Sequence, residues 1–260
     1  MSEQSKFLLC LDIGNSSAKL GKFDHGVLKK VISRGTKEFL RNPKILFSKV
    51  GNEKLPIVYC SVVPEVEKKV ISFARENSLD LNTFTWDLFE DLPISYPNPE
   101  EIGSDRLANA YAAFHIHSPN SIVVDIGTAT TFDVITSWGG YEGGVIAPGP
   151  QGYLDFLHWK TALLPQLKVS INQSFDQPFG KSTEAAMRLG VRLGHDHMTR
   201  GILDNLMEWF VGKHQIKPKV LLVGGASENF NLISALFTPN LTLEGLALAY
   251  QRKHFEIFNS

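Results

Sequence analysis

The sequence predicts an α/β protein made of two similar domains, and three observations support this fold class. Short apolar runs typical of buried strands alternate along the chain with longer segments of helical periodicity. Segment 8–23 reappears in a related form at 122–135. The chain has 260 residues, which is enough for one large domain or for two of about 130 residues.

The first half begins with an apolar strand over residues 7–12 that ends in the turn Asp-Ile-Gly-Asn. Further strands are expected at 18–24, 27–33 and 55–63. Pro64 suits the first position of a helix, where proline's missing N–H has no partner to lose. That helix is expected to run to about Asn77. Ser104 fits the N-cap of the next helix, whose inner face carries Leu107 and Tyr111.

The second half starts after a break at Ser118-Pro119-Asn120. A strand over 121–127 again runs into a turn and is followed by a returning strand over 130–136. Residues 139–152 are rich in glycine and proline, which predicts a loop with a little strand. The remaining expected elements are a long helix over 182–211, a strand over 219–225 and a last helix over 243–254.

The repeat organises these elements into two halves. Both copies read as an apolar strand, Asp-Ile-Gly, small polar residues and a returning strand, and their aspartates lie 113 positions apart. A chance match between two strand ends is the alternative. Duplication predicts one domain at 1–118 and a second at 119–260, with the last helix able to pack back on the first domain.

Composition excludes several classes of protein. There are 26 Lys and Arg against 27 Asp and Glu, for a net charge of −1. Without a basic surplus to neutralise a phosphate backbone, we expect no nucleic-acid partner. No apolar run approaches the ~18 residues of a membrane span, and the start of the chain is too short in apolar residues for a signal peptide. We therefore expect no membrane association and a cytoplasmic location. Cys10 and Cys60 lie in apolar runs and are expected to be reduced core residues.

The two repeated turns have the chemistry of phosphate-binding loops. Asp12 is followed by Asn15, Ser16 and Ser17, and Asp125 by Thr128, Thr130 and Thr131. A tight turn that offers N–H groups and short hydroxyls suits a phosphate chain, and the aspartates suit a hydrated cation that accompanies the phosphates. With a third glycine turn at 223–227, this pattern predicts a nucleotide in a cleft between the two domains.

The segment Gly180-Lys181-Ser182-Thr183 resembles the end of a P-loop but does not qualify as one. That motif needs glycine where this chain has Phe175, and it needs a preceding strand where this chain is polar. Thr183 is therefore either a functional hydroxyl at a helix start or simply a helix cap.

Residues 101–106 form the candidate chemical centre. Asp105 is expected in a first helical turn, where the helix dipole favours a carboxylate. There it can orient an acceptor hydroxyl and take its proton during phosphoryl transfer. Arg106 offers a planar fork for a carboxylate. From spacing alone, an exposed pair at a helix start is the alternative interpretation.

Taken in order, the motifs of the whole chain resemble those of the type III pantothenate kinases, the family that includes the Bvg accessory factor proteins. The segments that carry the resemblance are 12–15, 103–106, 125–131, 143–149, 161–165, 180–183 and 241–246. The resemblance implies two ribonuclease-H-like domains of the actin-like ATPase and sugar kinase fold. It also implies transfer of the ATP γ-phosphate to pantothenate in coenzyme A synthesis, a homodimer, Mg²⁺ with ATP, and a monovalent cation, K⁺ or NH₄⁺.

The same resemblance assigns roles to residues. Asp105 becomes the catalytic base, and Asp125 the ligand of the monovalent cation. Pantothenate is assigned to Tyr96, Gly103, Ser104, Asp105, Arg106 and Thr183. ATP is assigned to Asp12, Ile13, Gly14, Asn15, Ser16, Ser17, Ala18, Lys19 and Thr128.

The sequence departs from the family pattern at two places, and two other functions are possible alternatives. Ser16-Ser17 replaces the usual Thr-Asn, and Gly225-Ala226-Ser227 lacks an acidic residue often found there, which leaves details of the nucleotide-base site open. The alternatives are another actin-like phosphotransferase and a non-catalytic regulatory homologue.

His195 and His197, two positions apart on the expected long helix, are interpreted as surface histidines.

Overall fold

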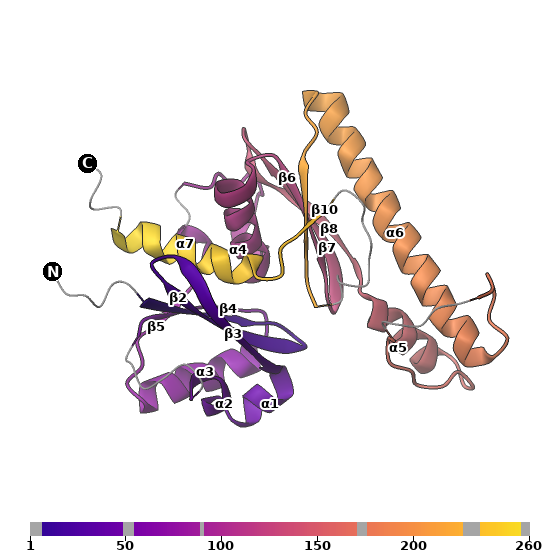
Figure 1. Cartoon of the computed structure of the whole chain (residues 1–260), viewed down its shortest axis with the longest axis horizontal. Coiled ribbons are helices and arrows are strands. Elements are labelled where there is room, and N and C mark those ends of the chain that lie inside the picture. The colour runs from indigo at the N-terminus through magenta and orange to yellow at the C-terminus, as the bar shows by residue number, and fades with distance from the viewer. Residues whose placement is uncertain (1–6, 49–54, 89–90, 171–175, 226–234, 256–260) are drawn as a thin grey trace. The chain divides into compact units, whose positions relative to one another are not determined.

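A computed structural model describes residues 7–48, 55–88, 91–170, 176–225 and 235–255 (Figure 1). The chain divides into two compact units. The first unit comprises residues 1–119, 136–142 and 240–260, and the second comprises 120–135 and 143–239. There are two five-stranded sheets, one based in each unit, and the second includes Thr136 and residues 140–142 of the first unit. Among the described helices, none combines the length and the apolar character that crossing a membrane requires.

The sheet of the first unit has the strand order β3-β2-β1-β4-β5. Its central strand β1 pairs antiparallel with β2 and parallel with β4, while β3 and β5 form the edges. The expected strands at the start of the chain are confirmed. The bounds are β1 Phe7–Ile13, β2 Ser17–Asp24, β3 Val27–Gly35, β4 Ile57–Ser61 and β5 Leu81–Thr83.

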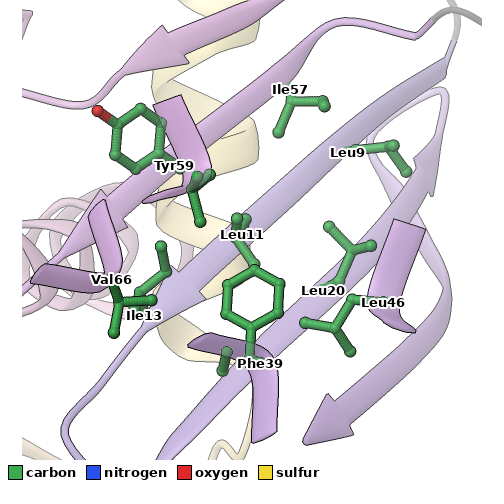
Figure 2. Close-up of a cluster of buried hydrophobic side chains, with 11 residues drawn as sticks. Leu9, Leu11, Ile13, Leu20, Phe39, Leu46, Ile57, Tyr59 and Val66 are labelled. Atoms are coloured by element: carbon green, nitrogen blue, oxygen red, sulfur yellow. The ribbon is translucent and has the colours of Figure 1, made fainter. Parts of the chain in front are cut away.

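One face of this sheet is covered by α1 (Thr36–Arg41), α2 (Lys44–Phe47) and α3 (Pro64–Glu76) (Figure 1). Alternate residues of β1 point toward this face because side chains alternate along a strand. Leu9, Leu11 and Ile13 lie there in one buried cluster with Phe39 of α1, as Figure 2 shows. Burial of each such side chain contributes roughly 1.5–3 kcal/mol to the stability of the fold. This cluster therefore fixes the position of β1, which carries Asp12 near its end.

The opposite face is covered by α4 (Ser104–Ala112) and α7 (Leu241–Phe255). These two helices approach closely at Gly245, where an added Cβ would lie 2.0 Å from the carbonyl oxygen of Ala108. Cys10 and Cys60 are buried and unoxidised, as expected. The 3₁₀ turns Trp86–Leu88 (η2) and Pro99–Glu101 (η3) and the π-helical turn Ala113–His117 (η4) complete the unit.

The sheet of the second unit repeats this topology. Its strand order is β10-β9-β6-β7-β8, in which β6 pairs antiparallel with β7 and parallel with β9, and β9 pairs parallel with β10. The central strand β6 therefore corresponds to β1. The bounds are β6 Ser121–Ile126, β7 Ala129–Thr136, β8 Gly140–Pro148, β9 Lys219–Val223 and β10 Ala235–Phe237.

Two helices complete the described part of the second unit, α5 (Pro150–Lys160) and the long α6 (Thr183–His214). Phe210 of α6 is buried among apolar side chains of the sheet, including Ile122 and Phe132. Nearer its start, α6 packs on α5 through Met187, Val191 and Leu154. The predicted long helix is thereby confirmed.

The structure corrects two of the predictions about secondary structure, and a third concerns residues outside the described ranges. Residues 139–152 are not mainly loop, since β8 occupies most of them and α5 begins at Pro150. Their glycines adopt positive φ at Gly140 and Gly143, which lets the strand start and bend rather than breaking it. Ser104 is the first residue of α4, and the N-cap is Gly103. Ala226 and Ser227 of the third glycine turn lie outside the described residues.

Candidate active site

The first candidate loop is the turn between β1 and β2. Gly14 N donates to Ser17 O over 3.0 Å and closes the turn, and Asn15 and Ser16 at its tip are exposed. Thr36 at the start of α1 braces the turn, because its Oγ1 donates to Gly14 O (2.6 Å) and its N–H donates to Ser16 O (3.1 Å). The backbone of the turn is therefore held in place by the start of α1.

Two carboxylates meet in the first unit near the end of β1. Asp12 is paired in the sheet with Cys60 of β4 and with Lys19 of β2. Asp105 lies in the first turn of α4, as predicted. The start of α4 is fixed to the end of β4 by Ser104, whose Oγ accepts from Ser61 N (3.2 Å) and donates to Ser61 O (3.3 Å).

Burial raises the pKa of both carboxylates, and the charge of Asp105 raises that of Asp12 further. Burial, followed by the charge of Asp105, raises the pKa of Asp12 from 3.8 to about 6, while Lys19 and the Cys60 thiol act in the opposite direction. The thiol donates to Asp12 Oδ1 over 3.7 Å. Burial also raises the pKa of Asp105, against the lowering effect of the Arg106 N–H and guanidinium. Divalent cations prefer carboxylate oxygens, so Asp12 and Asp105 are candidates to hold one.

The loop before α4 is shaped around Asp105. The carboxylate folds back so that Oδ1 accepts from Arg106 N over 2.8 Å. It also lies against Gly103, where an added Cβ would come within 2.6 Å of Oδ1. Glycine at 103 therefore allows the carboxylate to lie over the helix start, where the dipole stabilises its ionised form.

Arg106 and Tyr96 are linked through an aromatic residue that the sequence reasoning missed. The Arg106 guanidinium lies 5.9 Å from the ring centroid of Tyr141, and the rings of Tyr141 and Tyr96 meet edge to face at 6.2 Å. Tyr141 is fully buried and is fixed by backbone hydrogen bonds to Pro93 and Ser95. It lies within a glycine-rich stretch, which hid the strand that carries it, so no local pattern singled it out.

The second candidate loop is the turn between β6 and β7. Gly127 N donates to Ala129 O over 2.9 Å and closes the turn, and Thr128 at its tip is exposed. Gly149, at the start of α5, donates from its N–H to Thr128 O (3.1 Å). An added Cβ on Gly149 would come within 2.1 Å of Gly127 O, so only glycine allows this contact.

Asp125, at the end of β6, lies against the glycine turn after β9. Gly224 has φ of +95°, and an added Cβ there would come within 2.4 Å of Asp125 Oδ1 and of Ile126 O. A carboxylate oxygen and a backbone carbonyl oxygen thus converge on a space that a side chain would fill. Hard cations prefer oxygen ligands of this kind.

Two hydroxyl assignments of the second unit change. Thr130 was expected to offer its hydroxyl to phosphates, but it is fully buried and its Oγ1 contacts His195 Nε2 at 2.7 Å. Thr183 is the exposed first residue of α6, and the cap is Ser182, whose Oγ accepts from Ala185 N over 3.1 Å. Thr183 therefore does not serve as the helix cap.

The predicted site residues thus form two groups, each within its own unit. The first unit holds the turn from Asp12 to Lys19, the segment from Gly103 to Arg106, and Tyr96. The second unit holds Asp125 and Thr128 on one turn, and Thr183 at the start of α6.

The paired sheets define the class of this protein as the two-domain α/β fold of the actin-like ATPases and sugar kinases. The chain is similar to a solved structure described as a Baf family transcriptional activator from Campylobacter jejuni, with a TM-score of 0.61 and 21% identity over 95% of this chain and 98% of that one. It is also similar to MreB5 of Spiroplasma citri, solved with ADP, with a TM-score of 0.55 and 11% identity over 99% of this chain and 100% of that one.

Sequence comparison specifies the family. The family described as type III pantothenate kinase matches residues 8–205. A type III pantothenate kinase of Zymomonas mobilis is 36% identical over 76% of this chain and 72% of its own length. Another, from Persephonella marina, is 32% identical over 92% of this chain and 96% of its own length. The chain belongs to the type III pantothenate kinase family.

Proposed function

We propose that the chain transfers the γ-phosphoryl group of ATP to the hydroxyl of pantothenate, the first step of coenzyme A synthesis. The observation that carries the proposal is that Asp12, just before a closed polar turn, and Asp105, on a helix start beside Arg106, lie near enough for the charge of Asp105 to act on Asp12. A kinase whose substrate carries both a hydroxyl and a carboxylate needs three parts. These are a loop that binds phosphate, a carboxylate that accepts a proton, and a guanidinium that binds the substrate carboxylate. Family membership supplies the substrate.

In this proposal Asp105 is the general base. The acceptor oxygen forms a bond to the γ-phosphorus while the bond to the β,γ-bridging oxygen breaks, and ADP leaves. The transition state is loose, so the hydroxyl proton leaves late and must be accepted by a group already in place. The raised pKa of Asp105 makes it a better acceptor than an ordinary carboxylate.

The turn from Asp12 to Lys19 is assigned to the ATP phosphates. Its tip offers the exposed side chains of Asn15 and Ser16. Mg²⁺ that arrives with ATP would be held by the phosphates together with Asp12, and its charge supports the ionised forms of Asp12 and Asp105. The raised pKa of Asp12 without a cation supports this assignment.

Arg106, with Tyr96, Gly103 and Ser104, is assigned to pantothenate. The contact of the guanidinium with the buried Tyr141 ring limits how Arg106 can move, so its fork is held in one orientation for the substrate carboxylate. Thr183 of the second unit is assigned to the same substrate, in line with the exposure of its side chain.

The test of this function is an acceptor assay on the full chain. With MgATP and K⁺, we expect ADP and 4'-phosphopantothenate with pantothenate as acceptor, and no phosphorylated product with glycerol, hexoses or acetate. Phosphorylation of a different alcohol in preference to pantothenate would indicate another phosphotransferase. Nucleotide binding without transfer to any acceptor would indicate a regulatory homologue.

The carboxylate anchor has its own test. Arg106→Ala should raise KM for pantothenate by about 10- to 100-fold, the effect of losing a hydrogen bond to a charged group. The turnover number should change less, because the lost contact is made already in the ground state. The matched control is a neutral amide of pantothenate, for which Arg106→Ala should not raise KM. An equal increase for acid and amide would contradict the anchor role.

The monovalent cation, K⁺ or NH₄⁺, is assigned to Asp125, with Thr128 on the ATP phosphates. The oxygens of Asp125 and Ile126 beside Gly224 support this assignment. Within the described residues no cluster of three or more His, Cys, Asp or Glu could hold a metal, so a cation there would rely on one carboxylate and on carbonyl oxygens. Activity should be higher in K⁺ or NH₄⁺ than in Na⁺ at matched ionic strength. Equal activity in all three would contradict the assignment.

A homodimer in the cytoplasm completes the proposal. Large apolar side chains are exposed in the second unit, with Phe156 60% and Trp159 74% exposed on α5 and Leu163 92% exposed just after it. Exposed apolar surface of this kind favours association. Light scattering should give the mass of a dimer, and Trp159→Glu should weaken the dimer more than Trp86→Glu in the first unit. A monomeric mass at micromolar concentration would contradict the dimer.

A further inference from the structure

His195 is a buried polar residue in the middle of α6 that neither the family assignment nor the proposed mechanism uses. Its exposed fraction is 0%, whereas His197, two positions further along, is exposed. The interpretation of both as surface histidines is therefore wrong for His195. Spacing of two on a helix correctly implied that the rings point apart, and one of them points into the second unit.

Both ring nitrogens of His195 meet hydroxyl groups. Nε2 lies 2.7 Å from Thr130 Oγ1 on β7, and Nδ1 lies 3.4 Å from Thr199 Oγ1 one turn along the helix. A neutral imidazole has one donor and one acceptor nitrogen, and a hydroxyl can take either role, so the chain of contacts is satisfied in both tautomers. Burial lowers the pKa of His195 to about 4, which keeps the ring neutral near pH 7.

Thr130 connects this ring to the second phosphate turn. Its backbone pairs with Ile126 at the base of the turn whose tip is Thr128, and the next pair along is Asp125 with Thr131. The strand ends on either side of Thr128 are therefore held together by these two pairs, one of which includes Thr130. The His195 contact fixes the β7 arm of the turn to a long helix that is itself packed into the core through Phe210.

The turn is also held from a second element. The N–H of Gly149, at the start of α5, donates a hydrogen bond to Thr128 O. Further along α5, Tyr153 meets the His195 ring edge to face at 6.2 Å, and its hydroxyl contacts Met198 of α6 at 3.0 Å. The backbone of the turn is thus held by α5 and its Thr130 side chain by α6, with His195 at the place where the two helices meet.

We propose that His195 is a positioning residue for the Asp125–Thr131 turn, acting through Thr130 to set the affinity for ATP. The proposal rests on the assignment of this turn to the ATP phosphates. Without the Thr130 contact, the turn can adopt other positions. Binding of the ATP phosphates then has to order the turn, and this entropy cost lowers the affinity for ATP.

The geometry of histidine provides a sharp set of variants. The amide nitrogen of glutamine comes near the position of Nε2, and that of asparagine near the position of Nδ1. His195→Gln should therefore keep the Thr130 contact, whereas His195→Asn should lose it and keep the Thr199 contact. Thr130→Val removes the same contact from the other side at nearly constant volume. The control is His197→Asn, an exposed change on the same helix.

The measurement is calorimetric binding of a non-hydrolysable ATP analogue with Mg²⁺ to the full chain, beside steady-state kinetics. His195→Asn and Thr130→Val should weaken analogue binding and raise KM for ATP by about 3- to 10-fold, the range expected for one hydrogen bond. KM for pantothenate should stay within about twofold. His195→Gln should restore most of the affinity, and the double variant should lose little more than either single one.

A merely structural role would lower the melting temperature without this selective loss. Analogue affinity of folded Thr130→Val within about 1.5-fold of wild type would overturn the proposal, whatever its stability. If His195→Asn fails to fold, Thr130→Val decides the question. Since analogue binding requires no acceptor, failure of pantothenate turnover would count against the proposed function and leave this test intact.

Discussion

The two Asp-Ile-Gly turns share a backbone plan but differ in what surrounds their aspartates. Each turn joins a central strand to an antiparallel neighbour and lies beside a parallel strand. The first is closed between Gly14 and Ser17, and the second, one residue tighter, between Gly127 and Ala129. Asp12 faces a second carboxylate, whereas Asp125 faces the backbone of a glycine turn.

The contacts that hold the two turns in place differ as well. Thr36 holds the first turn by contacting its backbone twice. The second turn is held by Gly149 through its backbone and by His195 through Thr130. We infer that the repeated scaffold supports two tasks. The first turn lies beside the candidate chemical step, and the second has the rigid surroundings of a binding element.

The largest effect should come from Asp105, which distinguishes the first unit. Asp105→Asn keeps the shape of the side chain but cannot accept the acceptor's proton. We expect the turnover number to fall by about 10²- to 10⁴-fold, or roughly 3–5 kcal/mol of activation free energy. Steady-state kinetics with pantothenate measure this loss.

The control for Asp105→Asn is its stability and its nucleotide binding. Thermal unfolding and binding of a non-hydrolysable ATP analogue should change little, since the change is nearly isosteric at a helix start. A folded variant that keeps its turnover number within about threefold of wild type would exclude Asp105 as the base.

Gly149 tests the tighter surroundings of the second turn. Gly149→Ala drives a Cβ against the carbonyl oxygens of Gly127 and Thr128, at 2.1 and 2.6 Å, and backbone atoms cannot rotate away. Urea denaturation should show a loss of about 1–3 kcal/mol in the free energy of unfolding. KM for ATP should rise as Thr128 is displaced.

Two matched variants sharpen the comparison between the turns. Gly14→Ala in the first turn meets only Ser17 O at 3.3 Å and should be milder. Gly152→Ala on α5 meets Pro148 Cβ at 3.6 Å and should be neutral or stabilising by up to ~1 kcal/mol. Equal destabilisation by Gly149→Ala and Gly152→Ala would show that the close approach to the turn is unimportant.

The smallest effect concerns the charge on Asp12. Because its pKa is raised to about 6 in the folded chain, the folded state binds more protons than the unfolded state between about pH 4 and 6. The free energy of unfolding therefore falls as the pH rises through this window. Without nucleotide, Asp12→Asn should be more stable than wild type by about 1–2 kcal/mol near pH 7.5 and by less near pH 4.5. Urea denaturation at the two pH values measures the difference.

The control for Asp12→Asn is Asp87→Asn, which removes an exposed carboxylate of the same unit. That variant should keep the pH dependence of the wild type. If Asp12→Asn keeps it too, the pKa of Asp12 is not raised in the folded chain.

Sequence patterns predicted most of the scaffold because its signals are local. Asp-Ile-Gly after an apolar run predicted both turns, and Pro64 predicted the start of α3. Tyr141 and His195 were out of reach for a physical reason. Both acquire their surroundings from residues far along the chain, Arg106 and Thr130 respectively. Helical spacing shows that two side chains diverge, but only packing decides which one is buried.

The position of α7 bears on how the chain folds during synthesis. This helix contributes Leu243, Leu246 and Ala249 to the buried interior of the first unit and donates from Thr242 to Asn109 of α4 over 2.8 Å. Most of the first unit is therefore translated first, but it lacks one of its covering helices until α7 emerges. Every described residue of the second unit has by then been made. An enzyme assembled in this order completes the unit that holds its candidate catalytic carboxylate only after the described part of the other unit has been translated.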